Sequence, residues 1–225
     1  MTDTVTVAII GTCGRTQGDR LEPETFDFMC SKARTAITDT LGLDPSTVEL
    51  VSGGAAWADH VAVQLFNEEF VSKLTLHLPV ALEATKFHTN NTYSFKTNPG
   101  YSANKYHKSF SEITSKNSIA ELHQAIESGA SVQVHQGFHA RNKVIAQAEF
   151  MIAFTWGEGD YPAKGGTSHT WKHCRSTSKT HISLSNSQNK RKAETALCKP
   201  DTKRQKTLVS FFENVESEAS VGRPD

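Results

Sequence analysis

Residues 5–14 read V-T-V-A-I-I-G-T-C-G, and this stretch decides the fold class. Its first six residues are all β-branched or apolar, which is typical of a strand buried on both faces of a parallel sheet. Gly11 and Gly14 follow at once. Glycine allows the tight turn and the close backbone approach with which a chain leaves such a strand and enters a helix. We therefore predict a first strand that ends in a glycine turn.

The rest of the chain as far as residue 184 continues this alternation. Short apolar runs bounded by turn residues predict strands, and apolar residues at helical spacing predict helices. Gly42 follows one helical pattern as a C-cap. We predict helices over 24–41, 57–66, 119–128 and 140–148 and through Trp171, and further strands over 48–51, 74–78, 132–135, 150–155 and 180–184. This order predicts an α/β, Rossmann-like domain over residues 1–184, with a mostly parallel sheet flanked by helices.

Residues 86–117 interrupt the alternation. The segment is polar and rich in turn residues, so we expect a long loop or insertion. Its aromatic residues and lysines alternate: Tyr93, Phe95, Lys96, Tyr101, Lys105, Tyr106, Lys108 and Phe110. We favour a lid packed on the domain. The alternative is a stacking surface for single-stranded nucleic acid, because aromatic rings beside lysines bind bases and phosphates.

The chain after residue 184 has a different composition. It is polar and basic and has too few apolar residues to offset the entropy of ordering. We predict a disordered C-terminal tail, made of a basic linker over 185–204, a short motif over 205–212 and an acidic segment over 213–225.

Composition limits the class of protein. The formal net charge of the 225 residues is +0, so no field of one sign covers the whole molecule. Four cysteines lie far apart without a C-x-x-C pair, which favours reduced thiols in an intracellular protein: Cys13, Cys30, Cys174 and Cys198. Neither a secretion signal nor a membrane span is visible in the sequence, so we expect no membrane partner.

Three glycine turns, at 11–14, 52–54 and 165–167, each precede a predicted helix. In a parallel sheet such turns lie along one edge, where backbone N–H groups and helix N-termini form a cradle for a phosphate or nucleotide. The first turn is not G-x-G-x-x-G and no Walker lysine follows any of the three, so a conventional dinucleotide fingerprint is absent. The alternative is that these glycines only permit tight turns and close packing.

Three motifs together resemble the SLOG superfamily, which includes the DNA-processing protein DprA and the LOG-type cytokinin-activating phosphoribohydrolases. They are V-S-G-G-A-A-W-A-D-H-V-A at 51–62, F-H-A-R-N-K-V-I-A-Q-A-E-F-M-I-A-F at 138–154 and K-G-G-T-S-H-T at 164–170. The resemblance implies a Rossmann-like sheet with a nucleotide-like ligand on the glycine edge. Apart from such a ligand, we predict no cofactor. The residues that it implies for the ligand are Gly11, Thr12, Gly14, Arg15, Ser52, Gly53, Gly54, Asp59, Arg141, Asn142, Gly165, Gly166 and Thr167.

The same resemblance leaves catalysis open. The hydrolases of the superfamily look like P-G-G-x-G-T-x-x-E, with an acidic residue that assists glycosidic cleavage. Here Ser168, His169, Thr170 and Trp171 follow G-G-T, so that carboxylate is missing. Glu158 and Asp160 in the preceding loop are the available substitutes. Binding without catalysis and hydrolysis of a nucleotide N-glycosidic bond are both open, and the catalytic residues stay unknown.

Histidines offer a weak metal signal. His169 and His173 fall at i and i+4 of a predicted helix and Cys174 follows, but the sequence identifies no third ligand. His135 and His139 are weaker candidates still. We predict that the chain binds no metal.

The tail motif Q-K-T-L-V-S-F-F places Gln205, Leu208, Phe211 and Phe212 at the spacing of a single helical turn. It looks like the PIP box that binds the sliding clamp, proliferating cell nuclear antigen (PCNA). The pattern is complete, and the basic residues that often precede such motifs are present. The alternative is a turn that docks on its own domain through the two phenylalanines.

Two basic clusters in the tail resemble a bipartite nuclear import signal: Lys190, Arg191, Lys192, Lys203 and Arg204. The alternative is a solvated basic linker. With the clamp motif, they predict a nuclear protein that binds PCNA in DNA replication or repair, or one that acts at a viral replication site in a eukaryotic cell. Two alternatives are a LOG-like phosphoribohydrolase localised by its tail and a DprA-like single-stranded DNA-binding protein.

Overall fold

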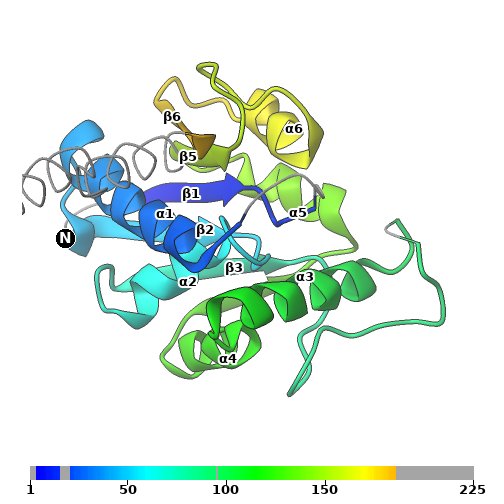
Figure 1. Cartoon of the computed structure of the whole chain (residues 1–225). Helices are drawn as coiled ribbons and strands as arrows, with labels where there is room; N and C mark the ends of the chain where they lie inside the picture. The colour runs from blue at the N-terminus through cyan, green and yellow to red at the C-terminus, as the bar shows by residue number, and fades with distance from the viewer. Residues whose placement is uncertain (1–3, 16–20, 95, 186–225) are drawn as a thin grey trace, which may run out of the picture. The chain divides into compact units, whose positions relative to one another are not determined.

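The structure is a computed structural model that describes residues 4–15, 21–94 and 96–185 (Figure 1). These residues belong to a compact unit, 1–187. The predicted linker, clamp motif, import signal and acidic segment lie outside the described residues, apart from Ser185.

The described residues form a sheet of six strands in which all neighbours are parallel, in the order β4-β3-β2-β1-β5-β6. The strands are β1 (Val5–Gly11), β2 (Val48–Ser52), β3 (Lys73–Leu78), β4 (Ser131–Val134), β5 (Phe150–Thr155) and β6 (Lys179–Ser183). The apolar run that opens the sequence is β1, in the middle of this sheet, and the predicted α/β class is confirmed. Successive connections build outward from β1 to β4, and the chain then returns to add β5 on the other side of β1. The strand order therefore reverses between β1 and β5.

Helices cover both faces of the sheet. They are α1 (Pro23–Thr35), which continues into a π-helical turn (Ala36–Thr40), a 3₁₀ turn (Pro45–Thr47), α2 (His60–Asn67), α3 (Pro99–Thr114), α4 (Ser118–Glu127), α5 (Phe138–Ile145) and α6 (Gly165–His173). The larger core joins α1 to α4 with one face of the sheet, and a smaller core joins α5 and α6 with the other. None of the described helices is both long and apolar enough to cross a membrane.

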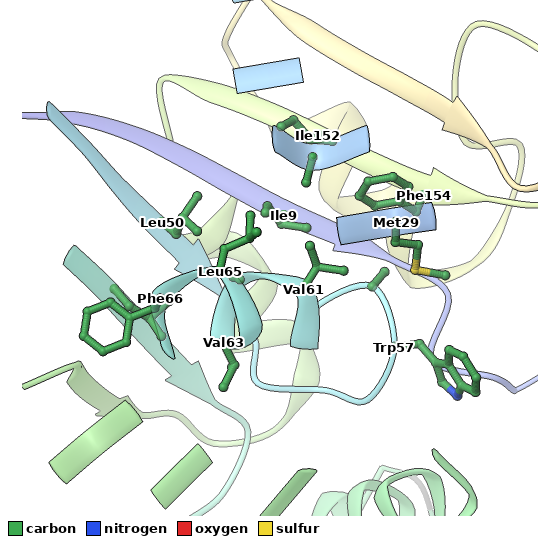
Figure 2. Close-up of a cluster of buried hydrophobic side chains, with 14 of the residues drawn as sticks. Ile9, Met29, Leu50, Trp57, Val61, Val63, Leu65, Phe66, Ile152 and Phe154 are labelled. Atoms are coloured by element: carbon green, nitrogen blue, oxygen red, sulfur yellow. The ribbon is translucent and has the colours of Figure 1, made fainter. Parts of the chain in front are cut away.

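The two cores explain why β1 needs a continuous run of apolar residues. Ile9 points from β1 toward Val61 of α2, while Leu50 and Ile152 extend the same layer on the neighbouring strands (Figure 2). Ala8 on the opposite face of β1 belongs to the smaller core. At about 25 cal/mol per Å² of buried apolar area, such fully buried side chains supply most of the driving force that positions the sheet edge.

The segment 86–117 is not simply a loop. Its second half, 99–114, is the helix α3, which begins with Asn98 as N-cap and Pro99 in its first turn. Phe110 on this helix is fully buried and packs edge to face on Phe26 and Trp57. The expectation of a long loop was wrong for these residues, because burial of one helix face outweighs their polar composition.

Trp57 also departs from prediction. The helix was expected to run through Trp57, but α2 begins at His60. The backbone of Trp57 has a φ of 65°, a left-handed conformation that is strained for a side chain of this size. Its indole is 1% exposed, so burial against α3 offsets the cost of that conformation.

Candidate functional site

The first and third glycine turns meet at the point where the strand order reverses. The Thr167 hydroxyl at the start of α6 donates a hydrogen bond to the Gly11 carbonyl at the end of β1, at 2.9 Å. Thr12 N–H donates to the Phe154 carbonyl of β5, also at 2.9 Å. In open α/β sheets ligands bind outside the carboxyl ends of the strands at such a reversal. The geometry therefore brings together residues 156 apart in sequence at the edge where a ligand is expected.

Gly11 is required by packing. A Cβ at this position would lie 2.2 Å from the Phe154 carbonyl oxygen and 2.6 Å from Ala58 Cβ. The glycine thus lets the end of β1 pass close to β5 and to the segment before α2. Gly14, three residues later, has a φ of 79° and lies against Trp57.

The N-terminus of α6 is open to a ligand. Among the described residues no side chain caps it by a hydrogen bond, and the first N–H groups of a helix have no acceptor within the helix. Together with the positive end of the helix dipole, these donors favour an anion. Gly166 is exposed, and the nearest atom to a Cβ built there is Asn142 Nδ2, at 3.8 Å.

The second glycine turn is filled by the chain's own residues. Gly54 N–H donates to the Ser52 hydroxyl at 3.1 Å, and that hydroxyl donates to the Asp59 carbonyl at 2.7 Å. The Asp59 carboxylate accepts backbone hydrogen bonds from Gly53 and Ala55. The backbone donors that could have bound a phosphate therefore bind the Asp59 carboxylate, so this turn is not available to a ligand.

Arg141 ties α5 to the second turn. Its guanidinium donates to the Gly53 carbonyl at 2.6 Å and lies 3.3 Å from the Asp59 carboxylate. Its Nε donates to Asn142 Oδ1 at 3.1 Å. Because that bond occupies the Asn142 oxygen, the amide nitrogen is left on the side of Gly166. Arg141 thus orients a donor toward the start of α6 while it neutralises Asp59.

Burial sets the protonation of the groups around the first turn. It raises the pKa of the Asp59 carboxyl, against the opposing effects of Arg141 and of backbone N–H groups. It also raises the pKa of the Cys13 thiol to about 11, with Asp59 adding to the effect and Arg141 and Arg15 opposing it. Cys13 therefore stays a thiol at neutral pH and is not an activated nucleophile.

Two buried histidines, one bonded to the second turn and one at the end of β3, were missed from sequence. His107 Nε2 lies 3.0 Å from the Gly54 carbonyl and donates to it, so Nδ1 accepts from the Ser118 hydroxyl at 2.9 Å. Burial and nearby His60 lower the pKa of His107 to about 3. His77 Nδ1 lies 3.0 Å from His135 Nε2, where β3 and β4 end. Burial, with His135 and Arg141, lowers the pKa of His77 to about 4. One sequence signal could have found the second pair. A histidine stands at or just after the end of each of two predicted strands, His77 and His135.

The residues considered as weak metal-ligand candidates do not form one site. His169 and His173 stack at 4.1 Å on α6 and His139 lies 5.6 Å from His169, while Cys174 is buried against Ala148. Across residues 4–15, 21–94 and 96–185, no group of three or more histidine, cysteine, aspartate or glutamate side chains is arranged to hold a metal ion. Glu158 and Asp160 are exposed in the loop between β5 and α6.

The comparison with curated proteins gives a relative from a giant virus. The chain is 36% identical over 185 residues to an uncharacterized protein, R261, of Acanthamoeba polyphaga mimivirus. The match covers 80% of this chain and 97% of the viral protein. The chain belongs to the family of this mimivirus protein. No protein-family model matches this member of the family, and no solved structure matches it.

Proposed function

We propose that the folded domain of this mimivirus-related protein binds a phosphorylated, nucleotide-like ligand between β1 and β5. The observation that carries the proposal is the hydrogen bond from Thr167 to Gly11, which joins two glycine turns where the strand order reverses. The phosphate would lie on the first turn of α6, with the amide of Asn142 beside it. Arg141 would orient Asn142 through its hydrogen bond, and Asp59 would hold Arg141 in place through their ion pair.

Binding of three compounds tests this proposal. Adenosine 5′-monophosphate, adenosine and inorganic phosphate are titrated into the full chain by calorimetry. We expect the monophosphate to bind more tightly than adenosine. Gly166→Val should abolish this binding, because its side chain would cover the N–H groups of α6. Gly159→Val is the matched control, since a Cβ there meets no atom of the described residues within 4 Å. Equal affinity of Gly166→Val and wild type would refute the site.

Hydrolysis of an N-glycosidic bond remains the second function to test. The superfamily resemblance supports hydrolysis. The acidic residue of the hydrolase motif is absent from Ser168 to Trp171 and argues against it. Incubation of the full chain with nucleoside monophosphates, followed by chromatography for the free base, distinguishes hydrolysis from binding without catalysis. Turnover that disappears in Glu158→Gln or Asp160→Asn would identify an enzyme with a displaced acid.

For the tail, we propose that Gln205, Leu208, Phe211 and Phe212 bind PCNA. The complete spacing of the motif supports this assignment, and the basic clusters before it support action in the nucleus or at a viral replication site. A short segment that orders on binding gives micromolar-class affinity, with Kd on the order of 1 μM.

A pull-down with PCNA tests the tail. We expect the wild-type chain to be captured, and Phe211→Ala/Phe212→Ala to be lost because both aromatic anchors are removed. Val209→Ala is the control, since this position is not defined by the motif. Capture of the double variant at the wild-type level would exclude the motif as the binding element.

A further inference from the structure

The aromatic residues of 86–117 divide into two groups. Phe87 and Phe110 are fully buried, whereas Tyr93 and Tyr101 are 82% and 41% exposed. The two tyrosine rings contact each other edge to face, with centroids 5.2 Å apart. They contribute little to the core, and a paired aromatic surface open to solvent is typical of an interaction site.

The loop that carries Tyr93 is held in a defined shape. Asn98 is 2% exposed, and its side chain accepts from Tyr101 N–H at 3.1 Å and donates to the Asn90 and Thr92 carbonyls at 2.8 and 2.6 Å. The Asn90 side chain in turn donates to the Thr97 carbonyl at 2.7 Å. These bonds restrain the backbone at Asn90 and Thr92, next to Tyr93, which reduces the entropy lost when a partner binds.

The charge of this segment is strongly positive. Residues 86–117 contain five lysines, one glutamate, and neither arginine nor aspartate, a net charge of +4 in a chain whose formal charge is +0. Lys96 is exposed on the tyrosine loop. Tyr101, Lys105 and Lys108 follow one another at i, i+4 and i+7, so they share one face of α3, and all three are exposed.

We propose that Tyr93, Tyr101, Lys96, Lys105 and Lys108 form a tyrosine–lysine surface that binds single-stranded nucleic acid. Unpaired bases stack on the tyrosine rings and lysines pair with the phosphates. A protein partner fits this composition less well, because protein interfaces are depleted in lysine and enriched in arginine. A duplex fits less well because its bases are already stacked.

The position of the surface agrees with this assignment. The segment between β3 and α3 leaves the sheet at the carboxyl ends of the strands, the side that carries the glycine turns (Figure 1). A nucleic-acid strand bound to this surface would not use the donors of the proposed ligand site. The inference does not depend on a ligand at α6, and the Gly166→Val variant should bind nucleic acid as wild type does.

Fluorescence anisotropy with a labelled oligothymidine of about 20 nucleotides tests the surface in the full chain. We expect binding at about 50 mM salt that weakens steeply at higher salt. Tyr93→Ala/Tyr101→Ala should weaken it by about ten-fold or more, because two stacking contacts are lost. Lys105→Gln/Lys108→Gln should reduce the slope of log K against log salt by about 1.4.

The control variants are Tyr161→Ala, which removes another exposed tyrosine, and Lys32→Gln/Lys73→Gln, which removes two exposed lysines elsewhere. We expect wild-type affinity from the first and a salt slope closer to wild type from the second. Unchanged binding by the double tyrosine variant would assign the nucleic acid to the basic tail and overturn the proposal. So would equal affinity for a duplex of the same length, or no binding by the wild type.

Discussion

Arg141 Nη2 on α5 lies 3.3 Å from Asp59 Oδ2 in the turn after β2, and both residues are at most 9% exposed. The carboxylate also accepts the backbone donors of that turn, so it occupies the place that an anionic ligand would take. The pair therefore closes the second glycine turn, whereas the turn at the start of α6 has no side-chain cap among the described residues.

The first prediction concerns this pair. Arg141→Ala leaves the buried Asp59 carboxylate without its cation, so the free energy of unfolding should fall by about 3–5 kcal/mol. Asp59→Asn/Arg141→Gln should cost less than the sum of the single variants, because neither charge is left alone. Urea unfolding of the wild type and of four variants, Arg141→Ala, Arg141→Gln, Asp59→Asn and the double variant, measures both. Additive costs below about 1 kcal/mol would mean that the pair is not coupled.

The ion pair affects how assays of the Arg141→Ala variant are interpreted. Loss of ligand binding or turnover in Arg141→Ala would be explained by a disturbed turn as well as by a lost ligand contact. Gly166→Val changes the start of α6, where a Cβ meets no atom closer than 3.8 Å in the part of the chain that the structure describes. It is the sharper variant for ligand contact.

The second prediction is a loss of stability in acid. The pKa of His107 is about 3 in the folded protein, against 6.5 as its ordinary value. Between these values the unfolded chain binds more protons, so the contribution is complete above pH 6.5 and is lost as the pH falls toward 3. The slope approaches about 1.4 kcal/mol per pH unit. His107→Gln keeps a donor for the Gly54 carbonyl and removes the titration.

Urea unfolding between about pH 7.5 and 5 compares this variant with wild type. We expect the variant to lose less stability over that range, while His77, whose pKa is lowered to about 4, still contributes a slope of the same sign in both proteins. Identical pH profiles would show that His107 is not held neutral.

The third prediction compares two glycines of the site. In Gly11→Ala the new Cβ meets the Phe154 carbonyl at 2.2 Å, so backbone must shift and stability should fall by about 1–3 kcal/mol. Gly166→Ala has room, and alanine is the better helix former, so its stability should be unchanged or higher by about 0.5–1 kcal/mol. The midpoints of thermal unfolding of Gly11→Ala and Gly166→Ala measure this difference. Equal midpoints would place the end of β1 farther from β5 than the structure does.

The sequence was sufficient to predict the strands of the sheet but not the helix α3 that packs near them. Strands such as β1 and β5 are short apolar runs whose period and flanking glycines identify them locally. The helix α3 was missed because its buried residues are Gly100, Ser102, Ala103, His107 and Phe110, and the polar Ser102 and His107 conceal the apolar period. The burial of His107 depends on hydrogen bonds to Ser118 and Gly54, which no local pattern shows.

The same limit applies to the site. Residue types and glycine turns identified the edge, because their chemistry is local. That the second turn is closed depends on Arg141 reaching a carbonyl 88 residues away, at Gly53. The packing of α5 against the sheet decides this, so the sequence could not distinguish the closed second turn from the uncapped turn at the start of α6.

The last prediction tests whether α3 is part of the core. The Phe110 ring is fully buried, with Phe26, Trp57 and His60 rings at centroid distances of 5.0, 4.9 and 5.2 Å. Phe110→Ala removes these contacts and leaves a cavity, so the free energy of unfolding should fall by about 3–5 kcal/mol. Ile113→Ala on the same helix, where the side chain is 38% exposed, should cost about 1 kcal/mol or less. Urea unfolding at neutral pH measures both. A cost for Phe110→Ala as small as that for Ile113→Ala would make α3 a lid laid on a domain that folds without it.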